Sequence, residues 1–209
     1  FRSHGMMDPA DLEQIRNRKR YYSGLVPALP PSYVRLMDCM TLTIGGQAWR
    51  CIAGYGHAPE HMALYCEALN VLISGDMVLP RISTNVSVYE MEPEADALTL
   101  FLDSIDRFLP LPDDVLVLPS HGKPFVGLHE RLRQLRDHHR DRLAEVMDAA
   151  REKPVSAYDV LPVLFKRPLD LHQTTFALGE AVAHLHRLWF AGQLRRERDA
   201  LGIWRFAPT

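Results

Sequence analysis

Residues 40–57 read MTLTIGGQAWRCIAGYGH. Two runs of alternating apolar and polar residues flank the pair Gly45-Gly46, and a two-glycine turn between such runs predicts a β-hairpin. The second run leads directly into Gly56-His57. The sequence therefore places an imidazole where a strand ends and a loop begins.

The chain after this hairpin repeats the arrangement of a strand followed by a polar residue. Strands are predicted over residues 62–66, 71–74 and 113–118, with an amphipathic helix over 95–109. The second of these strands leads to Asp76 and the third to His121. Strand ends of one sheet can converge, and imidazole with carboxylate suits zinc or another first-row metal. On spacing alone the alternative stays open, because a histidine at a strand end is more often a polar cap at the surface or a hydrogen-bonding group.

The remaining segments predict helices before and after these strands in the sequence, and a small second domain at the C-terminal end. Helices are predicted over 11–22, capped by Asp8, and over 128–153, 156–165 and 173–190, with a loop that leads into a short strand at 33–36. Two terminal strands, 193–198 and 202–206, follow the last helices, and this order is typical of a winged helix. We therefore predict domains over 1–152 and 153–209.

Composition describes an ordinary globular chain. The 209 residues are 47% hydrophobic and 24% charged, with a net charge of -2, which excludes a disordered chain and indicates no particular partner. No apolar run approaches the roughly 20 residues that span a bilayer, so we expect a cytoplasmic protein without membrane contact. Cys39, Cys51 and Cys66 lack CxxC spacing and are expected to be reduced and mostly packed thiols.

Three motifs together resemble those of the metallo-β-lactamase fold. Residues 56–61, Gly-His-Ala-Pro-Glu-His, resemble its Gly-His-Thr/Ser-Pro-Gly-His loop. Residues 74–76, Ser-Gly-Asp, resemble its Ser/Gly-Gly-Asp motif, and residues 119–122, Pro-Ser-His-Gly, its late His-Gly motif. The resemblance covers about residues 30–150 and implies an α+β fold, part of an αβ/βα sandwich, followed by the winged-helix-like domain.

The resemblance also implies a site and a chemistry. It makes His57 a ligand of a first metal, Asp76 the carboxylate that bridges two metals, and His121 a ligand of the second, while His61 is structural. Two divalent ions, expected to be zinc, would activate water to hydrolyse an ester, thioester, lactone, lactam or phosphodiester. We expect a small-molecule substrate, although the fold does not determine which bond is broken.

One motif of that family is missing. The His-x-His-x-Asp-His sequence, which supplies most of the metal ligands, occurs nowhere in the chain. The chain is thus either a fragment of an active protein or a degenerate, non-catalytic relative. Retention of the other three motifs and a first residue, Phe1, that is not Met favour the fragment, which would be inactive alone. A half-domain exposes strand edges, and this predicts a homodimer.

Substrate-binding and tail residues are less specific. Arg81 and Asn85 follow the Asp76 loop and are candidates for binding an anionic substrate, or alternatively for bridging loop carbonyls. Four tail arginines raise nucleic-acid binding as a second hypothesis, which the interspersed acidic residues disfavour; these are Arg187, Arg195, Arg196 and Arg198. Four further histidines are interpreted as solvated or core-edge groups; these are His138, His139, His184 and His186.

Overall fold

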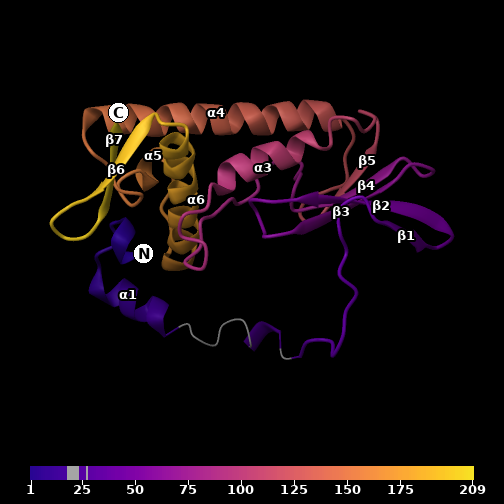
Figure 1. The fold of residues 1–209 in the computed structure, drawn as a ribbon, viewed down its shortest axis with the longest axis horizontal. Helices are drawn as coiled ribbons and strands as arrows, with labels where there is room; N and C mark the ends of the chain where they lie inside the picture. Colours follow the sequence, from indigo (N-terminus) through magenta and orange to yellow (C-terminus); the bar gives the residue numbers. More distant parts are fainter. Residues whose placement is uncertain (18–23, 27) are drawn as a thin grey trace.

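Five strands form a single sheet in the computed structural model, which describes residues 1–17, 24–26 and 28–209 (Figure 1). The strands are β1 (Thr41–Ile44), β2 (Gln47–Gly54), β3 (His61–Cys66), β4 (Val71–Gly75) and β5 (Leu116–Pro119). Their spatial order follows the chain, and neighbours are antiparallel except for β4 and β5, which are parallel. The C-terminal ends of β2, β4 and β5 consequently lie at one edge of the sheet.

The turn between β1 and β2 confirms the predicted hairpin. Gly45 and Gly46 have φ angles of 59° and 78°, and a two-residue turn with positive φ at both positions matches the twist of the flanking strands. Ile44 pairs with Gln47 across this turn. The strands predicted over 62–66 and 71–74 are confirmed as β3 and β4.

Two helices cover one face of the sheet (Figure 1). They are α3 (Ala97–Asp106) and α4 (Leu128–Glu152), and the side chain of Asp96 caps the first by accepting from the backbone of Thr99. Ile52, Tyr65 and Leu72 lie on the sheet face that packs against these helices. Burial of each such apolar side chain stabilises the fold by about 1.5 to 3 kcal/mol.

The opposite face of the sheet is also apolar but is only partly covered. Cys51 pairs with Leu64 and Leu64 with Ile73, so these three residues share that face. Ile73 remains 37% exposed and Leu116 39% exposed. The two faces of the sheet therefore differ sharply in how well they are packed.

The C-terminal region forms a second core. It contains α5 (Leu161–Leu164), α6 (Leu171–Phe190), β6 (Leu194–Arg198) and β7 (Trp204–Pro208). The second half of α4 packs into this core, as do Met6 and α1 (Pro9–Arg16), which follows a short 3-10 turn at Arg2–His4. The order of two helices and a hairpin agrees with the prediction, while the winged helix and the boundary after residue 152 stay predictions. No helix among the described residues is long and apolar enough to cross a membrane.

Several predicted elements are shorter than expected. The first helix spans Pro9–Arg16, capped by Asp8 as predicted, and residues 18–22 of the predicted helix lie outside the described residues. Residues 33–36 form no strand, so that prediction is wrong. The helix predicted over 156–165 is reduced to Leu161–Leu164, and residues 157–160 before it form a turn in which Ser156 and Asp159 exchange hydrogen bonds.

A buried histidine pair joins α4 to α6. His139 and His184 are fully buried, and Nδ1 of His139 lies 3.3 Å from Nε2 of His184. His184 Nδ1 donates to the carbonyl oxygen of Glu180 at 2.9 Å, so its Nε2 is the acceptor for His139. Burial lowers the pKa of His139 to about 3 and that of His184 to about 4. The interpretation of these residues, and of the buried His186, as solvated or core-edge is therefore wrong.

Candidate functional site

The three predicted ligands lie at one edge of the sheet. His57 follows β2, Asp76 follows β4 and His121 follows β5. These three strands run in the same direction, so their C-terminal ends lie together. Gly75 pairs with Pro119, and the backbone N–H of Ser120 donates to the carbonyl of Gly75 at 3.0 Å, which ties two of the loops together. A register shift between Ile73 and Gly75 marks an irregularity of the kind that redirects a side chain beside a functional site.

The Asp76 carboxylate lies between the two histidines. Its Oδ2 is 3.7 Å from Nε2 of His57, and its Oδ1 is 3.4 Å from Nε2 of His121. Two donors bound to one zinc ion at about 2.0 to 2.1 Å in a tetrahedron are about 3.3 Å apart. Each carboxylate oxygen therefore has one imidazole at the spacing of a shared ion, and the arrangement consists of two half-sites of two donors each.

The number of donors is too small for a complete metal site. Within residues 1–17, 24–26 and 28–209, no group of three or more His, Cys, Asp or Glu side chains is arranged to hold a metal ion. Structural zinc has four ligands and catalytic zinc commonly three from the protein. The donor chemistry and spacing of the edge thus fit a metal pair, but each half-site needs ligands beyond these three.

A hydrogen bond fixes the orientation of His57. Its Nδ1 lies 2.8 Å from the backbone carbonyl oxygen of Asn85. A carbonyl only accepts, so Nδ1 carries the proton and the lone pair of Nε2 points toward Asp76. Metal-binding histidines are typically held by such a second hydrogen bond.

His61 supports the Asp76 loop and is not a fourth donor at the edge. The backbone N–H of Asp76 donates to Nε2 of His61 at 3.1 Å, which occupies its lone pair. Burial lowers the pKa of His61, with the nearby His57 acting in the same direction. Gly75 has φ 55°, and a Cβ there would lie 2.3 Å from His61 Nε2, so only glycine fits this close approach. The structural role predicted for His61 agrees with these contacts.

The two candidate substrate-binding residues differ in their surroundings. Arg81 is exposed and has no ion-pair partner in the described part of the chain. Asn85 is half-buried, and its amide donates to Glu180 at 3.2 Å while accepting from Ser87 at 2.8 Å. The amide of Asn85 is thus engaged with the protein itself, and a substrate contact for either residue stays a prediction.

Arg131 of α4 holds the segment that follows Asp76, a role that the sequence did not reveal. Its Nε donates to the carbonyl of Leu79 at 2.6 Å and its guanidinium to that of Ile82 at 2.8 Å. Partial burial lowers the pKa of this arginine. It clamps the segment after Asp76, yet in the sequence it is one of many charges on a long helix, with nothing to distinguish it.

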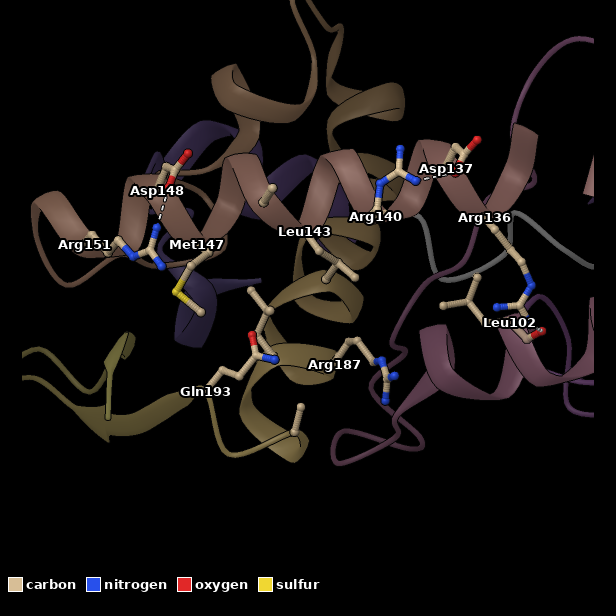
Figure 2. A pocket seen from close by; sticks show the side chains of 13 residues that line it. Leu102, Arg136, Asp137, Arg140, Leu143, Met147, Asp148, Arg151, Arg187 and Gln193 are labelled. Atoms are coloured by element: carbon tan, nitrogen blue, oxygen red, sulfur yellow. Dashed lines mark hydrogen bonds and ion pairs between the residues drawn. The ribbon is translucent and has the colours of Figure 1, made fainter. Parts of the chain in front are cut away.

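A separate groove lies along α4 (Figure 2). It encloses about 550 Å³ between α4, the end of α6 and Leu102 of α3. Its arginines are largely paired with neighbouring carboxylates, as Figure 2 shows for Arg151 with Asp148, whose atoms are 2.8 Å apart. None of the candidate ligands lines it. The groove is therefore not part of the candidate site.

Two of the four tail arginines are packed against aromatic rings. The guanidinium of Arg196 lies 3.9 Å from the ring centre of Trp189 and 4.2 Å from that of Trp204, and its side chain is only 10% exposed. Arg198 lies 4.3 Å from the ring centre of Trp204. Arg187 donates to the hydroxyl of Thr99 at 2.9 Å. These contacts stabilise the tail, and nucleic-acid binding stays an untested hypothesis.

Comparison with known families identifies the chain. The family model described as metallo-beta-lactamase superfamily matches residues 9–121, more than half of the sequence. The chain belongs to the metallo-β-lactamase superfamily. Residues 143–209 of this superfamily member also match the model described as metallo-beta-lactamase-like, C-terminal domain. Its architecture is accordingly the α+β metallo-β-lactamase-like fold with a C-terminal domain.

Individual relatives of this metallo-β-lactamase superfamily chain are longer than it is. A beta-lactamase domain protein from Burkholderia ambifaria is 56% identical and has a TM-score of 0.96. That match covers 100% of this chain and 60% of the Burkholderia protein. A metallo-beta-lactamase family protein from Thermus thermophilus is 28% identical with a TM-score of 0.79, covering 100% and 62%. The probable metallo-hydrolase YqjP of Bacillus subtilis is 27% identical over 145 residues, 68% of this chain and 44% of that protein. The chain thus spans less than two thirds of each.

Proposed function

We propose that this chain supplies part of the dinuclear metal site of a hydrolase. His57 and Asp76 would hold one divalent ion, expected to be zinc, and Asp76 and His121 would hold the second. The observation that carries this proposal is the position of the Asp76 carboxylate, with one oxygen 3.7 Å from His57 and the other 3.4 Å from His121. The name of the Bacillus subtilis relative, a probable metallo-hydrolase, supports the same class of reaction.

The residues of the chain would divide the work of such a site. When bound, the metal ions supply Lewis acidity and lower the pKa of water. Asp76 would hold both ions at a fixed separation, while the Asn85 carbonyl keeps His57 turned toward them. Arg81, exposed on the segment after Asp76, would attract an anionic small-molecule substrate. Ester, thioester, lactone and phosphodiester bonds are the candidate targets.

The proposal requires ligands beyond this sequence. The His-x-His-x-Asp-His motif is missing from all 209 residues, and each half-site offers two donors. We therefore propose that the chain alone binds zinc weakly and does not turn over substrate, whereas a longer form with that motif holds about two ions per chain.

Zinc titration of the metal-free protein tests the proposal. Followed by NMR of the histidine side chains, zinc should shift His57 and His121 together, and Asp76→Asn should abolish both shifts, because both half-sites share that carboxylate. Asp103→Asn, at an exposed position of α3, is the matched control and should leave both shifts unchanged. Zinc that shifts neither histidine would refute the metal site.

Metal content and activity of the longest natural form complete the test. Elemental analysis should find about two ions per chain in that form. A screen with the four substrate classes should give turnover that Asp76→Asn removes. A longest form that is metal-free and inactive would refute the hydrolase.

A further inference from the structure

The segment 85–88 lies directly against helix α6 of the C-terminal region. The backbone N–H of Val88 donates to the carbonyl oxygen of Gly179 at 3.1 Å. The hydroxyl oxygen of Ser87, whose proton is donated to Asn85, lies 3.4 Å from the carbonyl oxygen of Phe176. The Asn85 amide donates to the Glu180 carboxylate at 3.2 Å. Backbone and side-chain contacts thus fasten this segment to one turn of α6.

A glycine in the middle of α6 permits this close approach. A Cβ at Gly179 would lie 2.8 Å from both Cβ and Oγ of Ser87, closer than real Cβ contacts come. Glycine inside a helix is unfavourable relative to alanine, so its presence here has a local cause in packing. The close contact between α6 and segment 85–88 therefore depends on a glycine at position 179.

The same segment carries the carbonyl that orients His57. Asn85 accepts from His57 Nδ1 at 2.8 Å through its backbone oxygen, and both ends of its side chain are held, by Glu180 and by Ser87. Burial raises the pKa of Glu180 to about 7, opposed by the hydrogen bond from Asn85 and by the charge of Arg142. A continuous chain of hydrogen-bonded groups therefore runs from α6 to the edge of the sheet.

We propose that Glu180 is a positioning residue for the metal site, acting through Asn85 to hold the carbonyl that fixes His57. The C-terminal region then contributes to the geometry of the site through α6. The inference rests on the proposed function for the importance of His57, but the path itself belongs to the metal-free protein. Without Glu180, the Asn85 carbonyl loses its anchor and the His57 ring gains freedom to protonate Nε2 in place of Nδ1.

NMR of ¹⁵N-histidine-labelled, metal-free protein at mildly alkaline pH tests this path by reporting the tautomer of His57. Wild type should show Nδ1–H. Glu180→Ala should lower the ratio of the Nδ1–H to the Nε2–H tautomer by about fivefold, the factor that one net hydrogen bond represents. Glu180→Gln keeps an oxygen acceptor for the Asn85 amide and should restore the ratio. Thr175→Ala, which removes a side-chain hydrogen bond elsewhere on α6, should leave it unchanged.

A second variant keeps the test decisive if Glu180→Ala does not fold. Asn85→Ala removes the intermediate side chain and should lower the same ratio, and in the double variant the two effects should not add. An unchanged His57 tautomer in folded Glu180→Ala or Asn85→Ala would overturn the proposal, as would full additivity. Zinc titration of wild type separates the two ideas, because zinc that fails to shift His57 refutes the metal site and leaves the tautomer result standing.

Discussion

Acidification should destabilise this protein through the buried histidines of α4 and α6, and His139→Gln should remove a defined part of that effect. Glutamine does not titrate, and its amide N–H₂ keeps a hydrogen-bond donor at position 139 beside His184. The substitution therefore changes the proton balance at this position and leaves a polar side chain there.

The size of the effect follows from the shifted pKa. In the unfolded chain a histidine has a pKa of about 6.5, whereas burial holds the pKa of His139 in the folded protein at about 3. Its contribution to stability is present above about pH 6.5 and is lost as the pH falls toward the folded value, because only the unfolded chain takes up the proton. From pH 7 to pH 5 the loss is about 2 kcal/mol.

The change in the free energy of unfolding of the wild type between these pH values also contains contributions from other titrating groups. Burial raises the pKa of Glu180 to about 7, so its contribution is present at low pH and is lost as the pH rises through that value. Acidification therefore strengthens the fold through Glu180 while weakening it through His139. The difference between wild type and variant cancels such terms and isolates one histidine.

Urea unfolding at about pH 7 and pH 5 measures this difference. The pH-dependent loss should be smaller in His139→Gln than in wild type by about 2 kcal/mol. His172→Gln, which removes an exposed imidazole from α6, should behave as wild type does. Parallel losses in wild type and His139→Gln would refute the assignment of His139 as a neutral, buried group.

Two further substitutions test contacts at the edge and in the tail. Gly75→Ala should cost more than Gly45→Ala: both positions have positive φ, worth about 1 to 2 kcal/mol, but a Cβ at Gly75 also meets His61, whereas nothing lies within 4 Å at Gly45. Arg196→Lys should lower the free energy of unfolding by about 1 to 2 kcal/mol, because an ammonium stacks less well between two tryptophan rings, while Arg195→Lys at the exposed neighbouring position should change it little. Urea unfolding measures both pairs, and equal losses within a pair would contradict the reasoning.

The elements that the sequence predicted well are those set by local chemistry. The hairpin follows from Gly45-Gly46, and the long helix from its regular apolar stripe. The convergence of His57, Asp76 and His121 was predictable because each follows a strand, and strand ends of one sheet meet. Pattern and turn chemistry were sufficient for these features, because both act over a few residues.

The contacts that were missed join residues far apart in the chain. Asn85 and Glu180 are 95 residues apart, and no local pattern indicates that they meet. His139 is a different case, since it lies four residues after Leu135 and seven before Val146, on the buried stripe of α4. Its spacing indicated burial, but its charged neighbours concealed the signal. Periodicity was the better guide there than residue type.

Helix α4 has a mechanical consequence for the whole molecule. It is 25 residues long, about 38 Å at 1.5 Å per residue, and Leu132 belongs to the sheet core while Val146 belongs to the C-terminal core. One uninterrupted helix is thus packed into both cores. The angle between the sheet and the C-terminal region cannot change unless this helix bends or leaves one of the cores. The two cores should accordingly unfold in one cooperative transition, and the distance from α6 to the sheet edge is fixed by a continuous helix.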